Sequence, residues 1–126
     1  MNKKIFLIED DPAILDIYQT MIQKAGFDVE VFPLGKEFLQ AMEEMHTKEN
    51  KKPDLVLLDL ILPDMSGEEI LVKLKKNPLT QHIKVFILSN KENASGIIHD
   101  INPDKYIIKA DTSPTALIKI IQDELN

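Results

Sequence analysis

The feature that most constrains the fold is a run of four apolar residues that ends in a carboxylate. Residues 55–58 read Leu-Val-Leu-Leu and lead directly into Asp59. A short, continuous apolar run rich in branched residues is typical of a strand buried on both faces of a parallel sheet. Pro63 excludes helical geometry at the residue before it. Ser66 and Glu69 then form a capping-box pattern, which predicts that a helix begins there. The segment therefore predicts a buried strand with Asp59 at its carboxyl end, a turn and a helix.

Strand-like and helix-like segments alternate along the rest of the chain. Short apolar runs predict four further strands, at residues 5–8, 27–32, 83–88 and 105–108. Apolar residues at helical spacing predict helices over 12–25, 38–45, 67–76 and 114–125, and at best a short helix over 93–101. Because crossovers between parallel strands are right-handed, this order predicts an α/β fold, a doubly wound five-stranded parallel sheet with helices on both faces. A single domain over residues 1–126 is expected.

Composition narrows the classes of function. The net charge is −6, from 21 acidic and 15 basic residues. Direct contact with nucleic acid is not expected, because neutralising phosphates needs clustered Lys and Arg. The chain has no cysteine, which excludes disulfides, thiolate metal ligands and thiol nucleophiles. Without an apolar run of membrane-spanning length or a signal-peptide pattern, we expect a cytoplasmic protein with no membrane contact.

Polar residues stand where four of the predicted strands end. Carboxyl ends of parallel strands lie along one edge of the sheet, where ligands bind in such folds. We therefore expect these side chains to meet: Glu9, Asp10, Asp59, Ser89 and Lys109. Three carboxylates brought together repel one another. A hard divalent cation with oxygen ligands relieves that repulsion, and Mg²⁺ is the predicted cofactor because it also shares phosphate oxygens.

The same residues have the parts needed for phosphoryl transfer onto Asp59. A carboxylate at a strand tip can act as a nucleophile and form an aspartyl phosphate. A metal beside it would offset charge in the transition state. Lys109 supplies a positive charge for the phosphoryl oxygens, and Ser89 supplies a hydroxyl donor. The predicted reaction is therefore transfer of a phosphoryl group to Asp59.

Four motifs in order resemble the receiver domain of bacterial two-component response regulators. They are Ile-Glu-Asp-Asp after the first strand, Leu-Leu-Asp-Leu-Ile-Leu-Pro-Asp-Met-Ser-Gly after the third, Leu-Ser after the fourth and Tyr-Ile-Ile-Lys in the fifth. The resemblance covers the whole chain. It implies a flavodoxin-like fold of the receiver type and a phosphoacceptor domain in a phosphorelay. The phosphorylated domain would switch conformation to control a partner that the sequence does not identify.

The resemblance also implies a role for each residue of the site. Asp59 would accept the phosphoryl group. Asp10 and Asp59 would hold Mg²⁺ together with the backbone carbonyl of Ile61, and Glu9 would act through a metal-bound water. Phosphoryl binding would fall to Ser89 and Lys109. Tyr106 would be the switch aromatic, whose rotamer follows Ser89.

The donor implied by the resemblance is a phosphohistidine on a sensor histidine kinase or a phosphotransfer protein. Such a domain is not a conventional enzyme, because it catalyses only its own phosphorylation and dephosphorylation. The apolar arc of the last helix predicts core packing, and its rim is the candidate for a dimer contact. A monomer or a weak dimer is therefore expected.

Three positions depart from the family pattern. Ala110 stands where the family usually has a proline, commonly after a cis bond. A cis bond before alanine would cost about 2.5–4 kcal/mol, so we expect a trans bond there. Ser89 replaces the commoner threonine, and Asn90 occupies a position that is usually small, where it would narrow the phosphate pocket.

Other functions compete with this interpretation. A flavodoxin-like cofactor binder needs a hydroxyl- or glycine-rich phosphate loop after the first strand, where this chain has three acidic residues. An aspartate-dependent phosphatase needs a second carboxylate just beyond the nucleophile, where Leu60 and Ile61 stand. A phosphorylation-independent receiver-like protein-binding module is the remaining alternative. Individually, Asp10 and Asp11 could serve as helix caps, Lys109 as a surface lysine and Tyr106 as an edge-strand aromatic.

Overall fold

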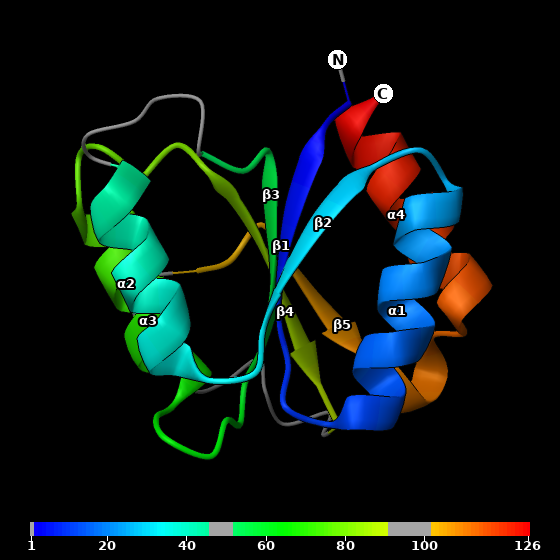
Figure 1. Ribbon diagram of the computed structural model, residues 1–126, viewed down its shortest axis with the longest axis horizontal. Coiled ribbons are helices and arrows are strands. Elements are labelled where there is room, and N and C mark those ends of the chain that lie inside the picture. The colour runs from blue at the N-terminus through cyan, green and yellow to red at the C-terminus, as the bar shows by residue number, and fades with distance from the viewer. Residues whose placement is uncertain (1, 46–51, 91–101) are drawn as a thin grey trace.

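The computed structural model describes residues 2–45, 52–90 and 102–126 (Figure 1). Five strands are present in these ranges: β1 (Lys4–Ile8), β2 (Asp28–Phe32), β3 (Leu55–Asp59), β4 (Lys84–Ser89) and β5 (Lys105–Ile108). The α-helices there are α1 (Pro12–Lys24), α2 (Gly35–Met45), α3 (Gly67–Lys76) and α4 (Pro114–Leu125). The helix expected over 93–101 lies outside the described residues.

The strands form one parallel sheet in the order β2-β1-β3-β4-β5. Helices α2 and α3 cover one face, and α1 and α4 cover the other (Figure 1). The predicted doubly wound sheet with helices on both faces is therefore confirmed. Strand β3 lies in the middle of the sheet, and each of its residues is buried, as its apolar run predicts.

The sheet separates two hydrophobic clusters, and β3 contributes to both. Val56 and Leu58 pack in the cluster under α2 and α3, whereas Leu55 and Leu57 pack in the cluster under α1 and α4. This division follows from the alternation of side chains along a strand. All four side chains are fully buried, and each contributes roughly 1.5–3 kcal/mol by leaving water. The strand that carries Asp59 is thus held from both faces.

Helix α1 starts immediately after the acidic residues that follow β1. Asp11 is its N-cap, and the carboxylate accepts hydrogen bonds from the backbone N–H groups of Ala13 at 2.9 Å and Ile14 at 3.3 Å. Pro12 occupies the first helical position, where no N–H is needed. Capping therefore uses Asp11, and Asp10 takes no part in it. Ile17, which the helical spacing places on the buried face, is instead 46% exposed.

Helices α3 and α4 both begin at serine caps, and the cap of α3 is the one that the sequence predicts. Ser66 caps α3, with its hydroxyl accepting from the N–H of Glu68 at 3.0 Å, one residue earlier than the capping-box pattern predicts. Ser113 caps α4 and accepts from Ala116 at 3.1 Å. These caps fix where each helix starts relative to the strand before it.

Candidate functional site

The strands β1, β3, β4 and β5 end around one cleft of about 300 Å³ at the carboxyl edge of the sheet, the edge where the parallel strands end. The cleft is lined by Glu9 and Asp10 after β1, by Asp59 at the end of β3, by Ser89 at the end of β4 and by Lys109 after β5. The structure thus brings together the five side chains that the sequence places at strand ends. It also places Asn90 and Ile61 in the lining.

The acidic residues of the cleft lie close enough to share one cation. One carboxylate oxygen from each of Glu9, Asp10 and Asp59 lies within 4.8 Å of the others. Glu9 is 1% exposed and Asp59 6%, whereas Asp10 is open to solvent. An open cluster of oxygen donors, partly buried and with a free approach, is the donor set that hard divalent cations prefer. The residues therefore fit a divalent metal ion.

Protein groups alone hold the Glu9 carboxylate in place. Its Oε2 accepts hydrogen bonds from the backbone N–H groups of Asp10 and Asp11, both at 3.1 Å. Its Oε1 lies 2.5 Å from the ammonium nitrogen of Lys109. Both carboxylate oxygens of Glu9 already have partners, so it is less free than Asp10 to turn toward a new ligand.

Lys109 is the cation that faces these carboxylates. It follows β5 and opens a short 3₁₀ turn, η3 (Lys109–Asp111). Its Nζ contacts Glu9 and lies 3.2 Å from Asp59 Oδ2, and its side chain is only 7% exposed. The bond between Lys109 and Ala110 is trans, as expected. A buried lysine whose ammonium reaches two carboxylates is not a surface lysine.

The surroundings of Asp59 in the cleft disfavour ionisation of its carboxyl group. Burial raises the pKa of the Asp59 carboxyl to about 6, and the negative charge of Glu9 adds to the rise, while the nearby Lys109 and the Ile61 amide oppose it. The pKa of Lys109 is also raised: burial lowers it, but the hydrogen bond to Glu9 and the charge of Asp59 outweigh that effect. The lysine alone does not compensate the acidic cluster.

The loop after β3 carries Ile61 past the Asp59 carboxylate. The Ile61 N–H donates to Asp59 Oδ1 at 3.3 Å, and the Ile61 side chain is 71% exposed. An antiparallel bridge joins Ile61 to Ser66 and closes the loop. A Cβ atom at Gly67 would lie 2.3 Å from the carbonyl oxygen of Asp59, so only glycine permits this close return of the chain.

Ser89 and Tyr106 occupy different parts of the site region. Ser89 is 2% exposed at the end of β4 and lines the cleft, next to the exposed Asn90. Tyr106 lies on the edge strand β5 and packs against the cluster under α2 and α3. Among the described residues its buried hydroxyl oxygen has no hydrogen-bond partner. Burial raises the pKa of this phenol, with a contribution from the charge of Glu68.

Sequence reasoning missed Ile14, which lines the cleft, and Asp64, which lies outside it. Ile14, in the first turn of α1, adds an apolar wall, and the signal was its position just after the acidic segment. Asp64, in the loop after β3, accepts hydrogen bonds from two amides at the start of α2. No local pattern predicts that contact, because the partners are 29 and 28 positions away.

No helix in the described parts of the chain is both long and apolar enough to cross a bilayer.

Comparison with known proteins gives a consistent result. The sequence model of the family described as response regulator receiver domain matches residues 5–122. The alkaline phosphatase synthesis transcriptional regulatory protein PhoP of Bacillus subtilis is 29% identical over 109 residues, which cover 86% of this chain and 43% of PhoP. The chain spans about half the length of the first curated relatives it matches.

Two solved structures share the fold over nearly the whole chain. The phosphorylated cyanobacterial phytochrome response regulator RcpA is 30% identical with a TM-score of 0.76, and the match covers 98% of this chain and 91% of RcpA. The Mn²⁺-bound form of response regulator Rcp1 is 26% identical with a TM-score of 0.77, and the match covers 96% of this chain and 90% of Rcp1.

Proposed function

This chain belongs to the receiver domain family of response regulators, the phosphoacceptor domains of two-component systems, and we propose that its phosphoacceptor is Asp59. The observation that carries the proposal is the setting of the Asp59 carboxylate. It lies at the tip of a fully buried strand, in contact with Lys109 and beside two further carboxylates. A phosphorylation-independent binding module is not favoured, because such a module does not need these groups in one cleft.

In the proposed reaction the Asp59 carboxylate attacks the phosphorus of a phosphohistidine. The O–P bond of an aspartyl phosphate forms as the N–P bond breaks, and the imidazole leaves with the electron pair. Lys109 would pass from the carboxylates to the new phosphoryl oxygens, and the Ser89 hydroxyl would donate to another. The existence of a phosphorylated form of the relative RcpA supports this assignment.

We further propose Mg²⁺ as the cation of the acidic cluster. Asp10, Asp59 and the backbone carbonyl of Ile61 would hold it, and Glu9, whose carboxylate accepts two backbone N–H hydrogen bonds and contacts Lys109, would act through a bound water. When bound, the cation would screen the carboxylates and the incoming phosphoryl oxygens from one another. The Mn²⁺-bound structure of Rcp1 supports a divalent ion in this family.

The remaining assignments extend the same proposal. The donor would be a sensor histidine kinase or a phosphotransfer protein, and Tyr106 would be the switch aromatic that follows Ser89. Within the described residues the buried phenol oxygen of Tyr106 has no hydrogen-bond partner, which supports the switch role, because such an atom gains by finding a partner in a second rotamer. A single domain over residues 1–126, a cytoplasmic location and a monomer or weak dimer stay predictions.

Phosphorylation by a small-molecule donor tests the proposal without the kinase. The chain is incubated with Mg²⁺ and acetyl phosphate, and intact mass spectrometry should show one added phosphoryl group that is stable to acid and labile to base. Asp59→Asn should take up none, and Asp10→Ala should need more Mg²⁺. Asp54→Asn is the matched control, because Asp54 flanks the other end of β3, away from the cleft. Undiminished labelling of Asp59→Asn would remove Asp59 from its role.

A further inference from the structure

The loop between β3 and α3, residues 60–66, carries the Ile61 carbonyl that the proposed cation needs. Part of its shape is fixed internally. The bridge between Ile61 and Ser66 closes it, and the N–H of Gly67 donates to the carbonyl of Leu60 at 2.8 Å. These contacts are all within the loop and its own helix. They do not determine how the loop sits relative to the rest of the domain.

Asp64 ties the tip of this loop to a different helix. Its Oδ1 accepts from the N–H of Gly35 at 2.9 Å, and its Oδ2 accepts from the N–H of Lys36 at 2.9 Å. Those two amides open α2, so both carboxylate oxygens bind the electropositive end of that helix. Figure 1 shows the loop after β3 beside the chain that enters α2. The amide hydrogen bonds outweigh the effect of burial and hold the pKa of Asp64 below its usual value.

A packing contact next to Asp64 fixes the same junction. A Cβ atom at Gly35 would lie 2.5 Å from Met65 Cγ and 2.6 Å from its sulfur. The Met65 side chain therefore lies directly on the backbone at the start of α2 and packs against the cluster beneath it. Two consecutive residues of the loop thus contact the first turn of α2, Asp64 through hydrogen bonds and Met65 through packing.

We propose that Asp64 is a positioning residue for the metal site: by binding the start of α2 it fixes the loop that presents the Ile61 carbonyl. The inference rests on the proposed function, since it assigns Asp64 to the support of that site. Asp64 is not among the residues that line the cleft. It would act only through the loop, in the way that residues behind a metal's own ligands set their orientation.

A purely structural role for Asp64 as a helix cap predicts a different outcome, and the chain offers a matched control. Asp54 likewise accepts a hydrogen bond from the backbone N–H of another element, at 2.8 Å from Lys4 N. It lies at the start of β3, at the opposite edge of the sheet. Loss of either carboxylate removes a tertiary hydrogen bond, but only Asp64 is connected to the Ile61 loop.

The test is calorimetric titration of the full chain with Mg²⁺, for wild type, Asp64→Ala, Asp64→Asn, Asp54→Ala and Asp10→Ala. We expect Asp64→Ala to raise the Kd for Mg²⁺ about tenfold, the size of effect seen when support behind metal ligands is removed. Asp64→Asn keeps one acceptor oxygen and should be intermediate. Asp54→Ala should bind Mg²⁺ like wild type. At saturating Mg²⁺ the rate of phosphorylation by acetyl phosphate should recover in Asp64→Ala, because the loss is in binding.

An unchanged Kd in Asp64→Ala, or an equal rise in Asp54→Ala, would overturn the positioning role. If Asp64→Ala does not fold, Asp64→Asn decides, because it keeps the side-chain volume, and a wild-type Kd in that variant overturns the role. Failure of the proposed function has a separate signature. It would appear as undiminished labelling of Asp59→Asn by acetyl phosphate, or as wild-type Mg²⁺ binding in Asp10→Ala, whatever the result at Asp64.

Discussion

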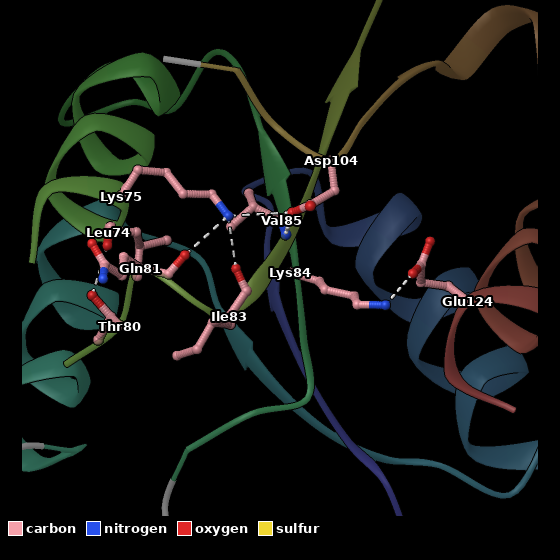
Figure 2. A network of polar contacts seen from close by, with 9 residues as sticks. All are labelled: Leu74, Lys75, Thr80, Gln81, Ile83, Lys84, Val85, Asp104 and Glu124. Carbon is pink, nitrogen blue, oxygen red and sulfur yellow. Dashed lines mark hydrogen bonds and ion pairs between the residues drawn. The ribbon is translucent and has the colours of Figure 1, made fainter. Parts of the chain in front are cut away.

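The two edges of the sheet use charge in opposite ways. At the amino edge, where the strands begin, charges are matched to partners: Lys75 Nζ donates to the carbonyl of Ile83 at 2.9 Å and lies 3.3 Å from Asp104 (Figure 2). Asp104 in turn accepts from the N–H of Val85 at 2.7 Å. At the carboxyl edge three carboxylates lie within 4.8 Å of one another, one buried lysine contacts two of them, and the pKa of Asp59 is raised to about 6.

This difference indicates which edge stabilises the domain and which carries its chemistry. The amino-edge contacts tie α3 to the start of β4 and β5, and an ion pair between Lys84 and Glu124 ties β4 to α4 (Figure 2). The carboxyl edge gathers like charges that disfavour the metal-free folded state. Clusters with perturbed pKa values are typical of functional sites, where stability is lost in exchange for reactivity.

The largest effect on stability should come from removing the ammonium group of Lys109 at the carboxyl edge. Lys109→Met leaves Glu9 and Asp59 buried without their shared positive charge. Breaking a buried ion pair in this way costs about 3–5 kcal/mol of the free energy of unfolding. Urea unfolding in EDTA at neutral pH measures it. Stability equal to wild type would mean that the lysine does not compensate the carboxylates, and the contrast between the edges would fail.

Removing the negative charge of Asp59 from the same cleft should instead raise the free energy of unfolding. Because its pKa is raised from 3.8 to about 6, ionisation of Asp59 destabilises the metal-free fold, and Asp59→Asn should add about 2–3 kcal/mol at neutral pH. Mg²⁺ should narrow this difference in stability, because it binds the wild type, with its ionised Asp59, more tightly than the variant. Urea unfolding with EDTA and with Mg²⁺ gives both values. A less stable Asp59→Asn would contradict the raised pKa.

The raised pKa of Asp59 should also appear in the pH dependence of the free energy of unfolding. Between about pH 4 and pH 6 the folded state holds a proton on Asp59 that the unfolded chain has released, so this contribution to stability is lost as the pH rises. The contribution is complete below the pKa of Asp59 in the unfolded chain and absent above its pKa in the folded state. The free energy of unfolding of wild type minus that of Asp59→Asn, measured in EDTA across this range, should fall with pH. A flat difference would count against the assignment.

At the amino edge, the loss of an aspartate should destabilise the protein. Asp104→Ala leaves the N–H of the fully buried Val85 without this acceptor and Lys75 without its ion-pair partner. The expected loss is about 1–2 kcal/mol, the cost of an unmade buried hydrogen bond. Thermal or urea unfolding measures it, and the Kd for Mg²⁺ should stay at its wild-type value. A variant with weakened Mg²⁺ binding would show that the two edges are coupled.

The smallest effect is expected where charges belong to neither edge. Lys119 and Asp123 form an ion pair on α4 at 2.8 Å, but their side chains are 72% and 64% exposed. Such pairs contribute only a few tenths of a kcal/mol. Lys119→Ala should therefore unfold at nearly the same urea concentration as wild type. A loss as large as that of Asp104→Ala would mean that pairing by itself, rather than burial, distinguishes the amino edge.

Local patterns in the sequence predict much of this arrangement. The apolar run before Asp59 predicts the buried central strand, and the caps at Asp11 and Ser113 predict where two helices begin. Parallel strands share a carboxyl edge whatever their order, so the sequence predicts that Glu9 and Lys109 lie on the same edge, whereas their contact depends on the strand order.

What the sequence does not predict depends on contacts between distant segments. The order β2-β1-β3-β4-β5 is set by pairing across crossovers, which periodicity does not encode. The hydrogen bond from Gly35 at the start of α2 to Asp64 joins residues 29 positions apart, and no sequence pattern near Asp64 indicates this contact. The exposure of Ile17 has a similar cause, because helical spacing gives the direction of an apolar face but its width depends on what packs against it.

The most direct test of the central claim is to locate the phosphoryl group chemically. The chain is phosphorylated with acetyl phosphate and Mg²⁺, the acyl phosphate is reduced with borohydride, and the modified residue is identified by peptide sequencing in a mass spectrometer. We expect modification at Asp59 and none when EDTA replaces Mg²⁺. Modification at another residue, or equal modification of Asp59 in EDTA, would contradict a cation-dependent phosphoacceptor at the carboxyl edge.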